Sequence, residues 1–262
     1  LEIKREVYEG QLSSLRQVAL PAIAAIGGMA IPAAIYLAFN ANDPIAAKGW
    51  AIPAATDIVL ALAFLALLGP RVPIALKVFL TALAIFDDFG TLVIIAVFYS
   101  GELSAFAMML ALVGISAALL LNRMRVTQTA AYVLVGVFLW VTLLKSGVHA
   151  TLAGVALAFC IPMRVDGREV LKQIEHNLSP WVAFGVVPVF AFFNAGIELG
   201  GSAIASLLEP ISAGVVLGLF LGKQLGVFAS ARAAVWMGLA SLPLGVSWWQ
   251  LYGVSLLAGV GF

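Results

Sequence analysis

The segment "KVFLTALAIFDDFGTLVIIAVFYS" (residues 77–100) has the length and apolarity of a membrane-spanning helix, yet two adjacent acids, Asp87 and Asp88, lie near its middle. A helix needs about 20 apolar residues to cross the hydrocarbon core of a bilayer. A charge at the centre of such a helix costs roughly 2.5–3.5 kcal/mol, and neighbouring carboxylates also repel each other. Because one polar side chain suffices for a structural hydrogen bond between helices, the pair favours an ion or proton site.

The composition of the chain extends this interpretation to the whole molecule. Hydrophobic residues make up 63% of the sequence and charged residues 10%, with a mean hydropathy of +1.10. Soluble domains carry about 25% charged residues, so this chain requires lipid as its solvent. A net charge of +1 and the lack of a basic tract argue against nucleic acid as a partner. The single cysteine, Cys160, cannot form an internal disulfide and is expected to be a packed thiol.

Nine apolar segments follow one another without a soluble domain or a low-complexity linker between them. They predict an all-α, polytopic membrane helix bundle in a single transmembrane domain, residues 1–262. Segments five, six and nine are shorter than a full membrane crossing requires. The segments lie near residues 18–39, 50–69, 75–99, 103–121, 130–144, 147–162, 180–198, 205–222 and 249–262.

The basic residues support this count of segments. When each Lys or Arg is assigned to its nearest connection, 12 of the 14 fall on one side of the membrane, and only Lys48 and Lys145 fall on the other. Cytoplasmic connections carry the excess of Lys and Arg, so the N-terminal end of this chain is predicted to be cytoplasmic.

Few charges remain inside the predicted spans. Ten of the 13 acids lie in connections or near segment ends, and the other three are Asp57, Asp87 and Asp88. Lys223 ends the eighth segment with apolar residues on both sides. Its position alone is compatible with a lysine that snorkels to the interface or with a functional charge inside the membrane.

The second segment contains the stretch "WAIPAATDIVLALAF", in which Pro53 precedes the polar pair Thr56 and Asp57. A proline alone usually kinks a helix, but here the polar pair could satisfy backbone groups that the proline leaves unbonded. We therefore expect this helix to be interrupted at membrane depth. The glycine-rich "LLAGVGF" at residues 256–262 could be a matching break, although glycines in apolar helices more often allow close packing.

Two carboxylates in a low-dielectric site can hold protons or a hard cation such as Na⁺ or Li⁺, but not both together. Access from alternate sides of the membrane would turn this competition into ion exchange. Two protons exchanged for one monovalent cation would move net charge, so the cycle would be electrogenic. A nearby lysine could neutralise one carboxylate in one state and be displaced in another.

Four stretches, "AIPAATDI", "ALAIFDDFG", "LKSGVHATLAG" and "GKQLG", resemble in order and spacing the NhaA-type sodium/proton antiporters of bacterial inner membranes. The resemblance covers essentially all 262 residues. It implies an inverted-repeat transporter fold with discontinuous helices, which is a property of that family. The nine segments are similar to the third to eleventh of twelve helices.

The resemblance also implies roles for individual residues. Asp87 and Asp88 match the cation- and proton-binding acids, and Lys223 matches a lysine that pairs with the first of them. Thr56 and Asp57 match the break in the family's fourth helix. Residues implicated in the response to pH correspond to Glu2, Arg5, Glu6, His149, Lys172, Glu175 and His176.

The implied activity is pH-regulated exchange of Na⁺ or Li⁺ for H⁺ in the lipid of the inner membrane, by a transporter rather than an enzyme and without a cofactor. A homodimer could form in the full-length protein. We expect the chain to be a fragment, because the family's first two helices, its dimer hairpin and its last helix have no counterpart here. The "GVGF" stretch resembles the break in the eleventh helix, so the second repeat would be incomplete. Gln224 departs from the proline that family members often have after the lysine.

Two other functions remain as alternatives. An intramembrane aspartyl protease also uses two buried acids, but its acids lie on separate helices, whereas Asp87 and Asp88 are adjacent. A proton-conducting subunit of a larger membrane complex would move protons without strict coupling to Na⁺.

Overall fold

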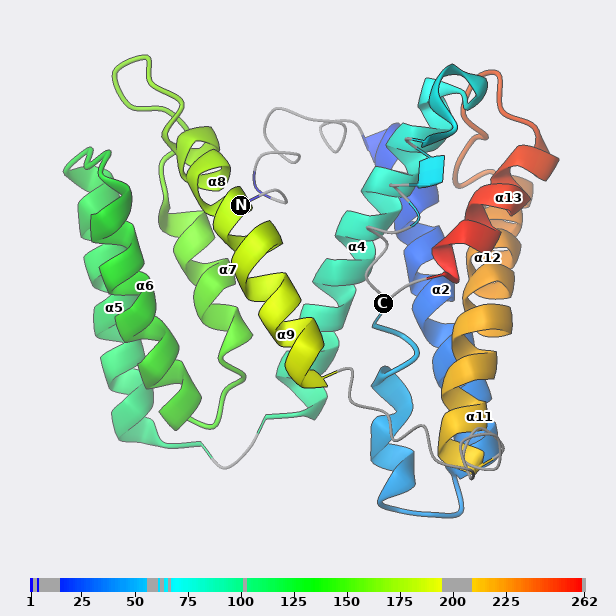
Figure 1. The fold of residues 1–262 in the computed structure, drawn as a ribbon, viewed down its shortest axis with the longest axis horizontal. Helices are drawn as coiled ribbons and strands as arrows, with labels where there is room; N and C mark the ends of the chain where they lie inside the picture. Colours follow the sequence, from blue (N-terminus) through cyan, green and yellow to red (C-terminus); the bar gives the residue numbers. More distant parts are fainter. Residues whose placement is uncertain are drawn as a thin grey trace. The chain divides into compact units, whose positions relative to one another are not determined.

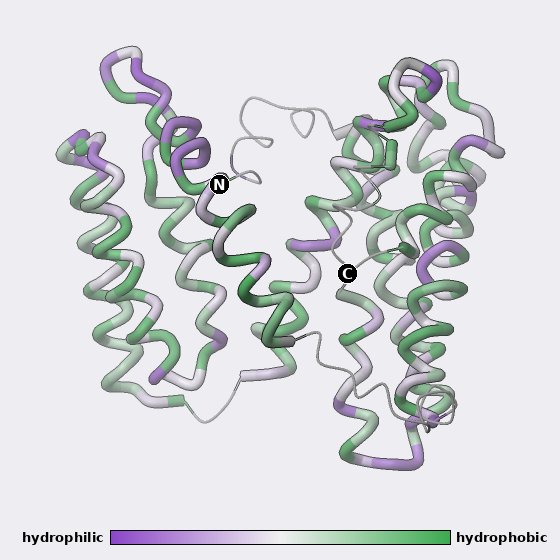
Figure 2. Tube along the Cα trace, in the orientation of Figure 1, coloured by the Kyte–Doolittle hydropathy of each residue, from purple (hydrophilic) through white to green (hydrophobic). Residues whose placement is uncertain are grey.

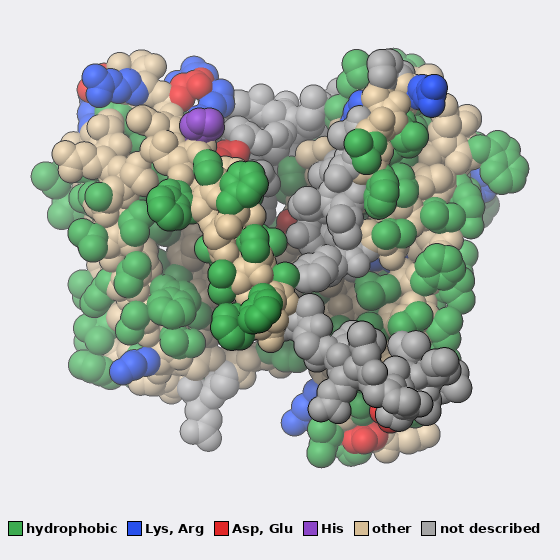
Figure 3. All heavy atoms as spheres, viewed as in Figure 1, with side chains coloured by type: hydrophobic (Ala, Val, Ile, Leu, Met, Phe, Trp, Pro, Cys, Tyr) green, Lys and Arg blue, Asp and Glu red, His purple; other side chains and the backbone are tan. Residues whose placement is uncertain are grey.

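The protein is helical throughout the part of the chain that the structure describes. The structure, a computed structural model, describes residues 1, 4, 15–55, 61, 64–65, 67–100, 103–194 and 209–260. Within these ranges every regular element is a helix, apart from an isolated bridge between Val165 and Arg168 (Figure 1). Apolar residues run along the helices (Figure 2), and most charged side chains on the visible face lie toward helix ends (Figure 3). The prediction of an all-α, polytopic membrane protein is confirmed.

Five helices among the described residues are long and apolar enough to cross a membrane. Two shorter apolar helices, Thr129–Lys145 and Thr151–Cys160, correspond to the short fifth and sixth predicted segments. Many large apolar side chains on these helices are exposed, as expected of surfaces that face lipid. The five candidate spans are Val18–Asn40, Ile74–Phe98, Ala105–Arg123, Val170–Phe193 and Pro210–Trp236.

The chain divides into two compact units, where the sequence predicts one domain. Unit 1 comprises Leu1–Tyr8 and Ile95–Glu198, and unit 2 comprises Glu9–Ile94 and Leu199–Phe262. One boundary falls inside a continuous apolar helix, at Ile94 and Ile95, so no polar linker marks it in the sequence.

Unit 2 is built around the contact between α2 (Leu15–Asn40) and α12 (Gln224–Trp236). Gly27 and Gly226 allow this contact, because a Cβ added to Gly226 would lie only 2.2 Å from the Gly27 carbonyl oxygen. Small residues at a crossing let helix backbones approach closely where lipid provides no hydrophobic driving force.

The other elements of unit 2 pack around this pair. The helix α4 (Ile74–Phe98) contributes Leu80 and Leu83 to the buried core, and α13 (Trp248–Ala258) contributes Leu251. The remaining elements are the short helices η2 (Ala46–Ala51) and η3 (Gly69–Arg71), the helix α11 (Pro210–Leu217) and the π-helical turn η5 (Gly218–Lys223).

Unit 1 contains an antiparallel helical pair, α5 (Ala105–Arg123) and α6 (Thr129–Lys145), against which α7 (Thr151–Cys160) packs. A second apolar cluster that includes Leu171 and Ile174 buries one face of the first helix after α7. That helix runs continuously as α8 (Val170–Trp181), the π-helical turn η4 (Val182–Val186) and α9 (Val187–Asn194).

Two helices extend beyond the predicted apolar segments. The helix that contains residues 180–194 of the predicted segment 180–198 begins at Val170. Its first turns carry the polar sequence "LKQIEHN", which an apolarity criterion leaves out. The helix that contains residues 210–222 of the predicted segment 205–222 continues through Lys223 to Trp236. Lys223 interrupts the apolar pattern of the sequence, but the helix continues through it.

Candidate ion-binding site

The two adjacent acids of α4 have different surroundings. Successive residues of an α-helix point about 100° apart, so neighbouring side chains can face different environments. Asp87 is directed into unit 2 and is 1% exposed, whereas Asp88 is exposed. The pair thus combines one carboxylate fixed in the protein interior with one that is accessible from outside.

The ammonium group of Lys223 lies against Asp87. Lys223 Nζ donates a hydrogen bond to Asp87 Oδ2, and the two residues are 136 positions apart in the sequence. It also donates to the Ala54 carbonyl oxygen at 3.2 Å. Lys223 is 0% exposed, so its side chain does not reach an interface as a snorkelling lysine would.

Small residues bring Lys223 to this position. A Cβ on Gly222 would lie 2.8 Å from Pro32 Cα, and one on Gly218 would lie 2.9 Å from Pro53 Cβ, so η5 packs closely on both segments. The stem of Lys223 passes over Gly28 of α2. The π-helical geometry of η5 shifts the register of the helix before α12, and such turns are frequent at functional sites.

Gln224, the residue after Lys223, also has a buried and hydrogen-bonded side chain. Its side-chain amide donates to the Phe220 carbonyl within η5 and accepts a hydrogen bond from the Tyr252 hydroxyl at 3.3 Å. Gln224 therefore adds a polar link between α12 and α13. The sequence indicates this link only through a second polar residue directly after Lys223.

The contacts of Lys223 offset the cost of burying its charge in an apolar interior. Removing each ion from water costs several kcal/mol, and this cost is offset only when the ions touch and their other groups are hydrogen-bonded. The contact with Asp87 and the bond to Ala54 provide this compensation for Lys223. The negative charge of Asp88 also acts on the same ammonium group. Two carboxylates and one ammonium therefore form a single electrostatic unit.

Two predicted residues of this site, Thr56 and Asp57, lie outside the described residues. The part of the predicted span 50–69 that precedes them is not a regular α-helix. Its chain runs from the 3₁₀ helix η2 through turns at residues 52–54. The Ala54 carbonyl, which sequence reasoning did not single out, comes from this irregular stretch beside Pro53, where backbone groups are available to side chains.

Four of the residues predicted to respond to pH are described, and all belong to unit 1, whereas Asp87 and Lys223 belong to unit 2. Glu2, Arg5 and Glu6 lie outside the described residues. Lys172, Glu175 and His176 share one face of α8, being three and four positions apart. His149 precedes α7 and its Nδ1 lies 2.9 Å from Thr151 Oγ1.

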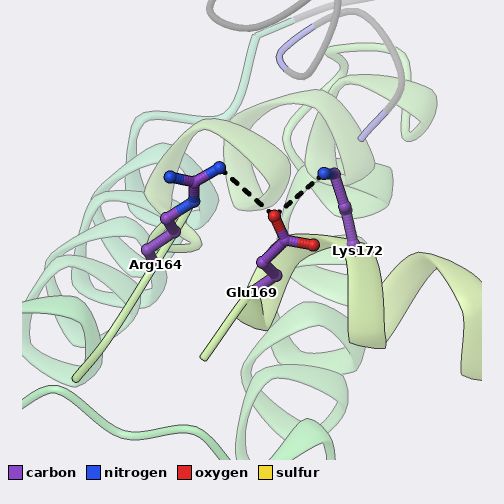
Figure 4. A network of polar contacts seen from close by, with 3 residues as sticks. All are labelled: Arg164, Glu169 and Lys172. Carbon is purple, nitrogen blue, oxygen red and sulfur yellow. Dashed lines mark hydrogen bonds and ion pairs between the residues drawn. The ribbon is translucent and has the colours of Figure 1, made fainter. Parts of the chain in front are cut away.

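Figure 4 shows the ion pairs at the beginning of α8. Glu169 Oε1 accepts from Lys172 Nζ at 3.0 Å and from Arg164 NH2 at 3.2 Å. The hydrogen bond from Lys172, assisted by both positive charges, lowers the pKa of Glu169 below its ordinary value of 4.5. Because these side chains are exposed, the network contributes little to stability.

Lys4 makes a contact that the sequence did not indicate. Its Nζ donates to the carbonyl oxygens of Phe159, at 2.8 Å, and Ile161, so it caps the C-terminal end of α7. Burial lowers the pKa of Lys4 from its ordinary value of 10.5. A cation at this position also complements the negative end of the helix dipole.

Comparisons with known proteins identify the family of this chain. The family described as Na⁺/H⁺ antiporter 1 matches residues 1–262. A protein of Maricaulis maris named Na(+)/H(+) antiporter NhaA is 63% identical over 262 residues, which are all of this chain and 65% of that protein. Proteins named Na(+)/H(+) antiporter NhaA from Sulfurovum sp. and Na(+)/H(+) antiporter NhaA 1 from Syntrophotalea carbinolica are each 53% identical, and the chain covers 68% and 67% of them.

The chain thus spans about two thirds of the length of these relatives. Antiporters are transporters and not enzymes, and the apolar helices are those of a multi-pass protein of the bacterial inner membrane. Since the match extends from the first residue to the last, the chain belongs to the Na⁺/H⁺ antiporter 1 family, whose relatives here carry the name NhaA.

Proposed function

We propose that the protein exchanges Na⁺ or Li⁺ for protons across the bacterial inner membrane, with Asp87 and Asp88 as the residues that bind both kinds of ion. The observation that carries this proposal is the buried contact between Asp87 and Lys223, next to an accessible Asp88 on the same membrane helix. The names of the relatives support exchange of Na⁺ for H⁺.

Each residue has a distinct task in this proposal. Asp88, the accessible acid, offers carboxylate oxygens to a hard cation, for which oxygen is the preferred ligand. Lys223 neutralises Asp87 while no metal ion is bound. Before the cation binds, Asp88 holds one proton and the ammonium group of Lys223, paired with Asp87, holds a second. A cation that enters between the two acids displaces the proton of Asp88 and competes with the ammonium group for Asp87, so that the Lys223–Asp87 pair gives up the second proton. Two protons leave for each monovalent cation, so exchange is electrogenic.

The remaining assignments complete the proposal. Thr56 and Asp57 offset the charges of helix ends near the site, and the residues predicted to respond to pH adjust the activity of the transporter. The latter are Glu2, Arg5, Glu6, His149, Lys172, Glu175 and His176. The transported Na⁺, Li⁺ and H⁺ are cargo, membrane lipid is the surrounding partner, and two copies of the full-length protein form a homodimer.

Proton release from the purified protein on addition of Na⁺, Li⁺ or K⁺ tests the site, in a version extended to the full length of the relatives. Asp88→Asn should abolish release by Na⁺ and Li⁺, because the amide neither binds a proton nor attracts a cation as a carboxylate does. Asp166→Asn is a matched control, since Asp166 is an exposed acid paired with Arg125 in unit 1.

The outcomes separate the proposal from its alternatives. Release by Na⁺ and Li⁺ but not K⁺, lost only in Asp88→Asn, supports a competitive carboxylate site. Proton movement that does not depend on Na⁺ or Li⁺ would favour a proton-conducting subunit. Retained release in Asp88→Asn would refute the assignment of the site.

A further inference from the structure

Arg232, a positively charged residue of unit 2, has no role in the proposed ion exchange. Arg232 lies on α12, one turn before this helix ends at Trp236, and its side chain is exposed. No acidic side chain pairs with Arg232 among the residues that the structure describes. The sequence contains no Asp or Glu at all from residue 210 to residue 262. Among the described residues, no acidic side chain therefore supplies an anion for this guanidinium group.

Aromatic rings organise the surroundings of Arg232. Its Cζ lies over the Trp248 ring, 4.9 Å from the ring centre, which is a cation–π contact. Phe228, one helical turn before Arg232, meets Trp248 edge to face with ring centres 6.1 Å apart. Phe228 also meets Tyr252 at 5.3 Å. These contacts join α12 to α13 and hold the arginine in one orientation.

A cavity of about 540 Å³ opens beside this arginine. Arg232, Trp236 and Trp248 line it, together with Phe228 and small or aliphatic residues of α12. Trp248 lies on one side of the guanidinium group, and the side chain of Arg232 is otherwise exposed. The edge of a guanidinium group presents parallel donors whose spacing matches a phosphate group, and the apolar lining suits hydrocarbon.

The position of the cavity in the membrane indicates the source of the phosphate. It lies where α12 ends and α13 begins, and Trp236 and Trp249 at this level are 87% and 84% exposed. Exposed tryptophans are enriched at the level of lipid headgroups. Arg232 also belongs to the connections that hold 12 of the 14 basic residues, which are predicted to face the cytoplasm. The cytoplasmic leaflet is where anionic lipids attract basic side chains.

We propose that Arg232, Trp248 and the cavity beside them bind the phosphate headgroup of an anionic phospholipid of the cytoplasmic leaflet. The guanidinium edge binds the phosphate, the indole holds the guanidinium group in place, and an acyl chain lies along the apolar lining. This site is separate from Asp87 and Lys223 and does not depend on the proposed ion exchange.

Native mass spectrometry of the detergent-purified full-length protein tests the site, with phosphatidylglycerol and phosphatidylcholine as probes. Arg232→Gln should lower the affinity for phosphatidylglycerol about fivefold and leave that for phosphatidylcholine unchanged. Arg232→Lys keeps the charge but loses the planar donor edge, so it should give an intermediate value while preserving the fold. Lys77→Gln is the matched control, since Lys77 belongs to the same side and unit but binds the Gly69 carbonyl at 3.0 Å.

Several results would overturn the proposal. Equal binding of phosphatidylglycerol by Arg232→Gln and the unchanged protein would do so, and so would an equal loss in Lys77→Gln. Displacement of phosphatidylglycerol by millimolar inorganic phosphate would show a site for the free anion. If Arg232→Gln changed the mass of the oligomer but not the amount of bound lipid, a second copy of the chain would be the partner that covers the cavity.

Discussion

Replacing Lys223 by Met is the most direct test of how the buried pair contributes to unit 2. Methionine is flexible and of similar length, so it fills the space of the lysine stem without the ammonium group. The variant leaves Asp87, which is 1% exposed, without its cation. The experiment therefore measures the cost of a buried carboxylate that has lost its partner.

The expected magnitude follows from burial and contact. Two unit charges about 4 Å apart attract by ~4 kcal/mol at an effective dielectric constant of about 20. The desolvation of Asp87 remains when this attraction is removed, so Lys223→Met should lower the free energy of unfolding by about 3–5 kcal/mol. At roughly 2–4 °C per kcal/mol, the apparent melting temperature should fall by on the order of 10 °C. The double variant Asp87→Asn with Lys223→Met should recover most of this loss, because neither charge then remains.

Tryptophan fluorescence during heating is a suitable assay, because four of the six tryptophans belong to unit 2, which contains the pair. These four are Trp50, Trp236, Trp248 and Trp249. Lys77→Met is the control, since it removes a lysine of the same unit that makes one bond to a carbonyl. The reasoning is refuted if Lys223→Met costs no more than Lys77→Met, or if the losses of the two single variants simply add in the double variant.

Two further predictions concern helix packing and the exposed ion pairs. Gly226→Ala should lower the melting temperature and reduce ion-driven proton release, because the added Cβ would lie 2.2 Å from the Gly27 carbonyl oxygen. Gly253→Ala is the control and should leave both quantities unchanged, because its Cβ would meet no heavy atom within 4 Å. Equal behaviour of the two variants would contradict the packing argument. Glu169 has a pKa lowered below 4.5 by its bond to Lys172, so its stabilising contribution is present above that pH and is lost as the pH falls through the folded-state pKa. The difference in melting temperature between the unchanged protein and Glu169→Gln should therefore shrink below pH 4.5, and a constant difference would refute this interpretation.

The limits of the helices show what local sequence can and cannot predict. Apolarity located the helices of unit 1 at residues 105–123 and 129–145 closely, because lipid-facing helices are apolar over their whole length. It placed the end of the eighth segment at residue 222, although the helix continues to Trp236. A charge inside a helix lowers local apolarity, but only the surrounding protein decides whether that charge can stay buried.

The sequence by itself determined that this is an all-α membrane protein with acids at the middle of one span. These properties follow from composition and from the order of residues along single helices, which fix the solvent and the secondary structure. Only the tertiary structure decided that Asp87 is buried, that Asp88 is exposed and that Lys223 meets the former and the Ala54 carbonyl. That meeting depends on how closely α2 and α12 pack at their glycines, and no local pattern specifies a contact between residues 136 positions apart.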